Sequence, residues 1–284
     1  MSLRTPDEPT GSPSAVDVAI PAALVSTSAA TGGPAVPTAD AVSAQRPLIP
    51  AGLRLTGGLL HGWQRRNASA SMPLALHHLV AAGNLDNIRL AIHAGEAAHG
   101  DAKRPRNLGP VDPVPGLGYQ GPVFMDSDIY KTLEAIGWEL ANGPRPDLSD
   151  FAASTIDLLA KAQQPDGYLH SYVQASGEPR YSRLAVSHEM YCAGHLIQAA
   201  IAMRRGTGDT GLLAIATRFA DQLVSEFAGE GKGLDGHPVI ETALAELYRE
   251  TGNRAYLDLA SQFTEQRGYG LAGDSGMGRR YLQD

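Results

Sequence analysis

Cysteine is almost absent from this sequence of 284 residues, which contains only Cys192. One cysteine cannot form an internal disulfide framework, and a lone thiol is typical of a reducing compartment. No apolar run has the length of a bilayer span. The N-terminal segment makes a poor secretory signal, because Pro21 and the polar run Ser26–Ser28 interrupt its apolar part. These absences predict a cytoplasmic protein without a membrane partner.

Basic patches are lacking as well. The chain carries 23 Lys and Arg against 30 Asp and Glu, a formal net charge of −7, so we expect no nucleic-acid partner. Aromatic residues are missing from residues 1–46, which are rich in Ala, Pro, Ser, Thr and Gly. Such a segment buries too little apolar surface to offset its ordering entropy. We therefore predict a disordered leader over residues 1–46 and one domain over residues 47–284.

Helical periodicity fills most of that domain. From Asp126 onward, one helix face carries the apolar residues Ile129, Leu133, Ile136 and Leu140. Residues 48–64 instead suggest a short strand or an extended lead-in. Further helices are predicted near residues 72–83, 84–100, 147–163, 186–198, 211–228, 238–250 and 254–267.

An internal repeat organises these helices. Thr207–Asp209 recurs as Thr251–Asn253, at an offset of about 44 residues. A unit of two helices joined by a Thr-Gly turn is an αα-hairpin, and such hairpins bury their apolar faces only against one another. The fold class is therefore all-α, with helical hairpins stacked into an (α/α) toroid or solenoid. The same offset relates Leu213, Ala216 and Phe219 to Leu257, Ala260 and Phe263.

The stretch VSHEMYCAGHLIQ (Val186–Gln198) concentrates polar chemistry. His188, Cys192 and His195 are spaced so that they share one helix face, as metal ligands often do. A buried cysteine and a core histidine explain Cys192 and His195 more simply. Cys192 also lies mid-helix, away from the electropositive setting that activates a thiol, so we reject it as a nucleophile.

Other polar residues fall at helix starts. Asp126, His188 and His237 each lie at or just before the first helix of a hairpin, where a toroid presents a rim suited to a polar ligand. Asp126 is equally well interpreted as a helix cap, and Asp128 lies beside it. Tyr168 follows the turn Pro165–Gly167 and either stacks on a sugar or packs inside. The carboxylates form no convincing acid and base pair.

Five segments together resemble glycoside hydrolase family 127, the family of β-L-arabinofuranosidases. The likeness runs from about Leu53 to Asp284, with the motifs in the family's order. It implies an (α/α)6 barrel, of which this chain holds about half, and it implies that His188 and His237 contact the sugar. The segments are GPVFMDSDIYKTLEA, AQQPDGYLHSY, SHEMYCAGHLIQAA, TGDTGLLAIATRFAD and GHPVIETALAELYRETGNRAYLDLASQF.

The resemblance also implies retaining hydrolysis by a zinc-held cysteine nucleophile and a glutamate acid/base. In the family these residues and the other zinc ligands come after the motifs seen here. We therefore expect no catalytic residue and no metal ligand before Asp284, and no activity from this chain alone. Cys192 matches a helix cysteine of the family and not its nucleophile. A half toroid also exposes the apolar sides of its end helices, so we expect self-association.

Two other functions stay open on the sequence. The first is a non-catalytic half toroid that binds carbohydrate or a partner protein. The second is another α/α-toroid sugar enzyme, such as an epimerase or an unsaturated-uronyl hydrolase. The run of family 127 segments favours the glycoside hydrolase, with an arabinofuranoside-containing glycan as its partner.

Overall fold

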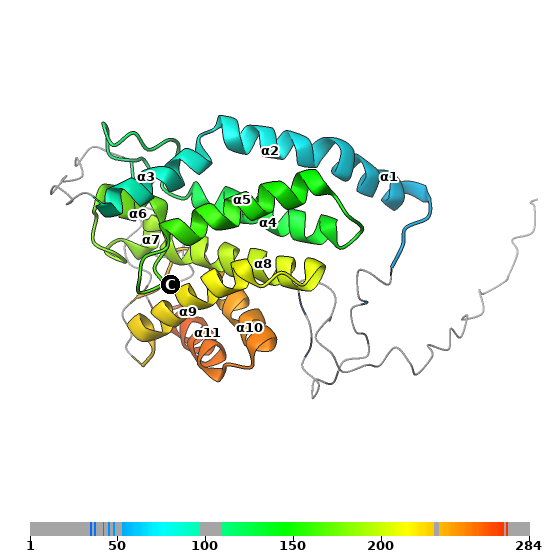
Figure 1. The fold of residues 1–284 in the computed structure, drawn as a ribbon. Helices are drawn as coiled ribbons and strands as arrows, with labels where there is room; N and C mark the ends of the chain where they lie inside the picture. The colour runs from blue at the N-terminus through cyan, green and yellow to red at the C-terminus, as the bar shows by residue number, and fades with distance from the viewer. Residues whose placement is uncertain are drawn as a thin grey trace, which may run out of the picture.

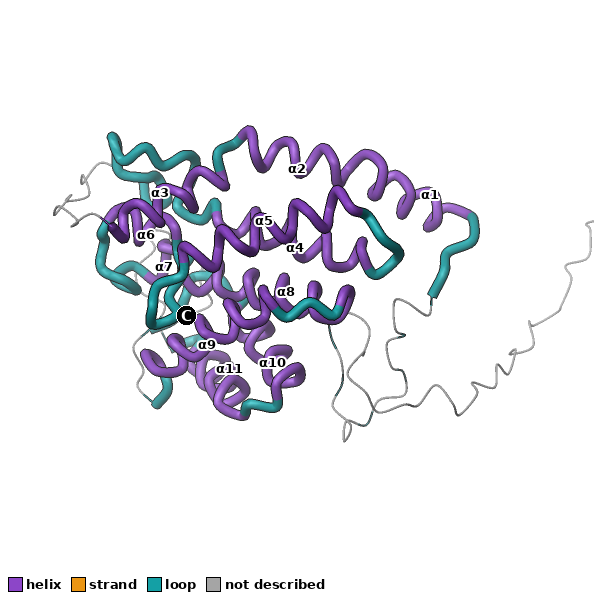
Figure 2. The backbone as a smooth tube through the Cα atoms, in the orientation of Figure 1, coloured by secondary structure: helices purple, strands orange, loops and turns teal. Residues whose placement is uncertain are grey.

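The computed structural model describes residues 53–96, 109–229 and 233–269, together with single residues before and after them. These residues fold into helices and connecting loops and contain no strand (Figures 1 and 2). Within the same residues, no helix combines the length and the apolar character that a membrane span requires. The predicted disorder of residues 1–46 falls almost wholly outside the described part of the chain.

A nearly continuous helical run opens the described chain. It consists of α1 (Gly58–Arg66), a π-helical turn (Asn67–Ser71) and α2 (Met72–Ala81), and it lies along one edge of the molecule (Figure 1). Helix α3 (Asn84–Glu96) follows. The expectation of a short strand or an extended lead-in over residues 48–64 is wrong from Gly58 onward, where α1 begins. Its sequence GLLHGWQRR lacks β-branched residues, and Leu, Gln and Arg favour a helix.

Three helical hairpins form the body of the fold. The first helices of the hairpins pack side by side, α4 on α8 and α8 on α10, and the second helices α5, α9 and α11 form a neighbouring layer (Figure 1). This arrangement confirms the predicted all-α hairpin architecture. The hairpins are α4 (Asp126–Leu140) with α5 (Pro146–Ala162), α8 (Glu189–Thr207) with α9 (Gly211–Phe227), and α10 (Ile240–Thr251) with α11 (Arg254–Gln266). Two short helices, α6 (Ser171–Ser176) and α7 (Leu184–Ser187), connect α5 to α8.

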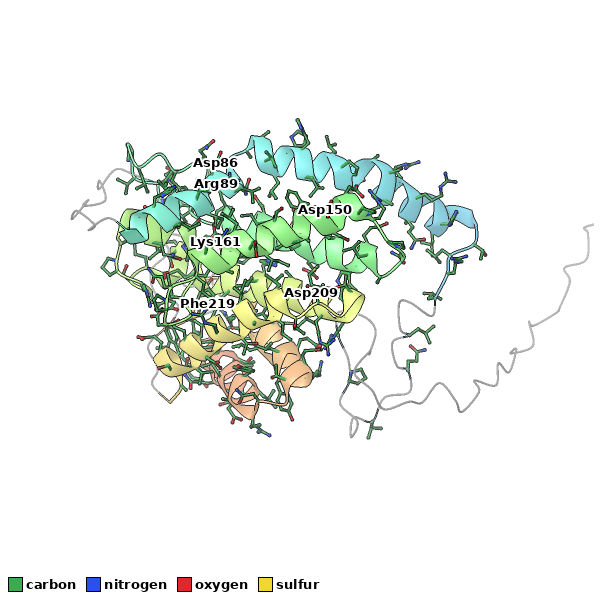
Figure 3. All side chains as sticks on the ribbon, viewed as in Figure 1. Asp86, Arg89, Asp150, Lys161, Asp209 and Phe219 are labelled. Carbon is green, nitrogen blue, oxygen red and sulfur yellow. The ribbon has the colours of Figure 1, made fainter. Side chains whose placement is uncertain are left out.

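The repeated turn has the same geometry in both copies. Gly208 and Gly252 take left-handed conformations, with φ of 83° and 75°, and end α8 and α10. The hydroxyl of Thr207 donates to the Met203 carbonyl and accepts from the amide of Asp209, which Figure 3 labels. Thr251 makes the equivalent pair of bonds. The motif makes its hydrogen bonds within a few residues at the end of the helix. The repeat can therefore be recognised from a short stretch of sequence.

Buried apolar side chains fill the space between the hairpins. The predicted face Ile129, Leu133 and Ile136 is fully buried on α4. The repeat positions Phe219, labelled in Figure 3, and Phe263 are fully buried on α9 and α11. Most of the periodic residues identified in the sequence are therefore core residues, whereas Leu140, Leu213 and Leu257 are half-buried.

Helices α4 and α8 approach each other most closely at glycines. A Cβ atom added at Gly137 would lie 2.7 Å from the Ala202 carbonyl carbon, and one added at Gly206 would overlap the Gly137 carbonyl oxygen. Backbone cannot move aside as a flexible side chain can. The two helices therefore pack at this distance only because neither position carries a side chain.

We expect Gly206→Ala to destabilise the fold by about 1–3 kcal/mol, the usual cost of overpacking a well-packed contact. Chemical denaturation of the 284-residue chain measures this change in the free energy of unfolding. The matched control is Gly62→Ala on α1, where an added Cβ meets nothing within 4 Å. There the better helix propensity of alanine should leave stability unchanged or raise it by up to about 1 kcal/mol. Equal effects of the two substitutions would contradict the close-contact explanation.

Candidate functional site

His188 lies at the break between α7 and α8. Its backbone is left-handed, with φ 60° and ψ 23°, which is uncommon outside glycine. Its Nδ1 lies 2.7 Å from the Val186 carbonyl oxygen. A carbonyl oxygen only accepts, so Nδ1 carries the proton, and Nε2 of the neutral ring is an acceptor. The break therefore fixes both the direction and the tautomer of this imidazole.

His237 reaches the same point from the turn before α10. Its Nε2 lies 3.0 Å from Nε2 of His188, and the ring centroids are 4.8 Å apart. Because Nε2 of His188 accepts, Nε2 of His237 donates. The structure thus brings together two histidines that are 49 residues apart in sequence and that each lie just before the first helix of a hairpin. We define them as the histidine pair.

Aromatic side chains and one cation surround the histidine pair. The Tyr191 ring centroid lies 5.5 Å from that of His188 and 5.1 Å from that of His237. The Phe124 ring lies 4.7 Å from the His188 ring. Lys131 donates to the Tyr191 hydroxyl at 2.7 Å. The histidine pair therefore packs among aromatic rings, with His188 buried and His237 half-buried. The Lys131 ammonium group is close enough to affect both imidazoles.

This environment keeps the imidazoles neutral. Burial, together with the proximity of His237 and Lys131, lowers the pKa of His188 to about 4, against the raising effect of the Val186 carbonyl. Burial, followed by the Lys131 charge, lowers the pKa of His195 to about 4. The pKa of His237 is lowered by burial, Arg267 and Lys131. At neutral pH each ring therefore offers one donor and one acceptor.

Asp126 is not exposed to a ligand, which corrects its assignment to the sugar site. Both carboxylate oxygens accept from Ser171, one from the amide at 2.7 Å and the other from the hydroxyl. The side chain is fully buried, and burial raises its pKa to about 6, against the lowering effect of the Ser171 bonds. It does not cap its own helix either, because α4 has no side-chain cap. Asp126 joins the start of α4 to the start of α6.

Asp128 remains on the surface near the histidine pair. Its side chain is 49% exposed, and Oδ1 lies 4.0 Å from Nζ of Lys131. Of the two aspartates predicted at the rim, Asp128 is therefore the one whose carboxylate stays accessible, beside the Lys131–Tyr191 contact. Its contact with a sugar stays a prediction.

Tyr168 is a packing residue, which corrects its assignment as a stacking platform. Its side chain is fully buried, and its hydroxyl donates to Glu189 at 2.5 Å. The Arg180 guanidinium covers the ring at 4.1 Å from its centroid, and the rings of Tyr181 and Phe219 lie within 5.6 Å. No face of the ring is left for a sugar.

Glu189 organises the chain around His188, a role that the sequence did not reveal. It accepts from the Tyr168 hydroxyl, from the Tyr181 amide at 2.9 Å and from the Ser187 hydroxyl at 2.7 Å. Ser187 therefore donates to this carboxylate and does not cap α8. Burial raises the pKa of Glu189, although these bonds oppose the shift. Since its oxygens are occupied by the protein, Glu189 supports the His188 backbone and does not face a ligand.

The residues described here do not fit a zinc site. Cys192 is fully buried, its Sγ lies 3.8 Å from the Phe124 carbonyl oxygen, and burial raises its pKa well above the usual value. Such a thiol is neither a ready ligand nor a nucleophile. Across the described ranges, His, Cys, Asp and Glu side chains form no group of three or more that suits a metal ion. The interpretation of Cys192 as a buried structural residue agrees with this geometry.

The family of this chain follows from its match to a protein-family model. Residues 53–284 match the family model described as the β-L-arabinofuranosidase, GH127 catalytic domain. The chain belongs to glycoside hydrolase family 127. It is also 47% identical over 158 residues to the non-reducing end β-L-arabinofuranosidase of Bifidobacterium longum, a match that covers 53% of this chain and 24% of that protein.

Solved GH127 structures share the fold. A GH127 β-L-arabinofuranosidase from Geobacillus stearothermophilus T6 superposes with a TM-score of 0.65 and 34% identity, over 76% of this chain and 32% of its own. A second GH127 β-arabinofuranosidase gives a TM-score of 0.65 and 28% identity, over 78% of this chain and 34% of its own. The chain thus spans about a third or less of the GH127 relatives that it matches.

We expect His188 to stay neutral down to about pH 5. Its pKa in the folded chain is about 4, below the value of about 6.5 in an unfolded one. The unfolded chain therefore gains the proton first, and this group lowers the free energy of unfolding as the pH falls from about 6.5 towards 4. NMR titration of the ring signal that His188→Ala removes measures the pKa, and the same titration in urea is the control. A folded-state midpoint near 6.5 would contradict the buried pair.

Proposed function

We propose that this chain forms one side of a binding site for a terminal β-L-arabinofuranosyl residue. The histidine pair carries the proposal. Nε2 of His237 donates and Nε2 of His188 accepts, at 3.0 Å from each other. A sugar hydroxyl has both a donor and acceptor lone pairs. It could therefore replace the bond between the rings, accepting from His237 and donating to His188 once the two nitrogens separate to admit it.

The names of the relatives support the sugar class. The Bifidobacterium protein is a non-reducing end β-L-arabinofuranosidase, and the Geobacillus structure is a β-L-arabinofuranosidase. We extend that substrate to this chain as part of the proposal. A cytoplasmic location, in keeping with the single free cysteine, stays a prediction.

Hydrolysis, in this proposal, requires residues that these 284 do not supply. The family mechanism uses several cysteines, whereas this chain has only Cys192, which is buried within α8. The buried carboxylates Asp126 and Glu189 are occupied by protein donors and unsuited to act as acid/base. The 284-residue chain is therefore proposed to bind the sugar without cleaving it, whereas the reaction belongs to a protein that also holds the zinc-dependent part.

We expect His188→Ala and His237→Ala each to weaken binding of methyl β-L-arabinofuranoside about tenfold. Each variant loses one hydrogen bond to the sugar, worth about 1–1.5 kcal/mol. Calorimetry or saturation-transfer NMR measures the affinity. His78→Ala, which removes an exposed histidine from α2, is the matched control and should bind as the unsubstituted chain does.

The same samples test the catalytic half of the proposal. Incubated with an aryl β-L-arabinofuranoside, the unsubstituted chain should release no aryl alcohol above the rate of a buffer blank. Turnover that His188→Ala abolishes would show that these residues suffice for hydrolysis and would overturn the proposal. Binding that neither histidine variant weakens would exclude the histidine pair as the sugar ligand.

We also propose that the chain self-associates through its first two helices. Side chains on α1 and α2 are more than half exposed although they are large and apolar: Leu59, Leu60, Trp63, Leu74 and Val80. Analytical ultracentrifugation should show species larger than the monomer at micromolar concentration. Trp63→Glu should shift the distribution towards the monomer because it places a charge on the apolar surface, whereas Ser71→Glu, at an exposed polar position, should not. A monomer at all concentrations would refute the proposal.

A further inference from the structure

The N-terminus of α8 has no cap from its own segment. The first amides of a helix need acceptors, which a Ser, Thr, Asp or Asn at the N-cap usually provides. Here His188 occupies the N-cap, and its side chain makes no capping bond because the ring points towards His237. The missing acceptor comes from 45 residues further along the chain, where Oδ2 of Asp235 accepts from the amides of Met190 and Tyr191, both at 3.1 Å.

The other oxygen of the same carboxylate holds the second histidine. Oδ1 of Asp235 accepts from the amide of His237 at 2.9 Å. Gly236, which lies between Asp235 and His237, is also held in place, because its amide donates to the Leu184 carbonyl at 3.3 Å. A Cβ at Gly236 would overlap the Ala185 carbonyl oxygen. The loop from Asp235 to His237 is therefore docked directly on the α7–α8 break.

We propose that Asp235 is the positioning residue of the histidine pair: one buried carboxylate fixes the backbones that carry His188 and His237 and so sets the distance between their rings. Asp235 is 1% exposed and does not touch the proposed sugar position. It acts through the two segments that it joins. The effect of Asp235 on sugar affinity rests on the proposed function, whereas its effect on the geometry of the histidine pair does not.

Several charged and titratable groups lie near the Asp235 carboxylate. A substitution that tests Asp235 must leave the contacts of these groups in place. Glu189 at the start of α8 is close enough for like-charge repulsion. Arg267, after α11, donates to the Asp235 carbonyl at 3.2 Å and to Glu241 of α10. An isosteric amide preserves the volume and these neighbours, and it removes the ionisable charge and the ability to accept at both ends.

Asp235→Asn is therefore the decisive variant. An asparagine has one acceptor oxygen, so it can serve either the α8 amides or the His237 amide while its NH2 group opposes the other. In the unsubstituted chain, ring 15N spectra should show His188 protonated at Nδ1 and His237 at Nε2. In Asp235→Asn the pattern of His237 should relax towards the tautomer mixture of a free imidazole, and sugar affinity should fall about tenfold. The double variant with His237→Ala should lose no more than about another twofold.

The matched control is Glu246→Gln, which alters a buried carboxylate bound by Arg205 in the middle of α10. It should lower stability and leave both the ring spectra and the affinity unchanged. Unaltered ring spectra in Asp235→Asn would overturn the proposal and leave Asp235 as a cap alone. If the ring spectra change but neither histidine variant affects sugar binding, the positioning role stands and the proposed function fails.

Hydrogen exchange of the unsubstituted chain tests the same idea if Asp235→Asn does not fold. The amides of Met190, Tyr191 and His237 share one carboxylate, so they should open with the same free energy and be protected together. Exchange of the His237 amide at a much lower free energy than the other two would overturn the proposal.

Discussion

The parallel contact between α4 and α8 is the constraint on which the other features depend. Gly137 and Gly206 let the two backbones meet near their C-terminal ends. Near their N-terminal ends the same pair of helices brings Cys192 against the Phe124 carbonyl and Lys131 against Tyr191. Because both helices start at the same end of the stack, their first turns and the loops before them form one surface, and the histidine pair lies on it.

Buried carboxylates stabilise the irregular backbone beneath that surface. His188 and Tyr181 are the non-glycine residues with positive φ in the described chain, and both lie next to hydrogen bonds made by Glu189. A left-handed conformation costs of order 1 kcal/mol and persists where surrounding contacts enforce it. Here the buried carboxyl groups of Glu189 and Asp235 provide those contacts, since each accepts from more than one donor of the surrounding chain.

The sequence predicted the hairpins, because they depend on regular spacing. Apolar periodicity located α4 and α9, and the order of the hairpins placed His188 and His237 each beside the start of a first helix, without showing that the two rings meet. Spacing says nothing about which distant group will meet a buried polar side chain. Asp126 was therefore assigned to the rim although it bonds to Ser171, and Tyr168 was assigned to a ligand although Glu189 holds it inside. Asp235 could not be singled out, since its partners lie 45 residues away.

The two threonine–glycine turns have a consequence for the order in which the chain folds. Each turn closes its hydrogen bonds within a few residues, from Met203 to Asp209 and from Leu247 to Asn253. Short loops close quickly and at small entropic cost, whereas contacts between residues distant in sequence form only after the intervening chain has been ordered. We therefore expect the hairpins to form before the Asp235 bridge, which pulse-labelling exchange during refolding would resolve. The surface that carries the histidine pair is then among the last parts of this chain to fold.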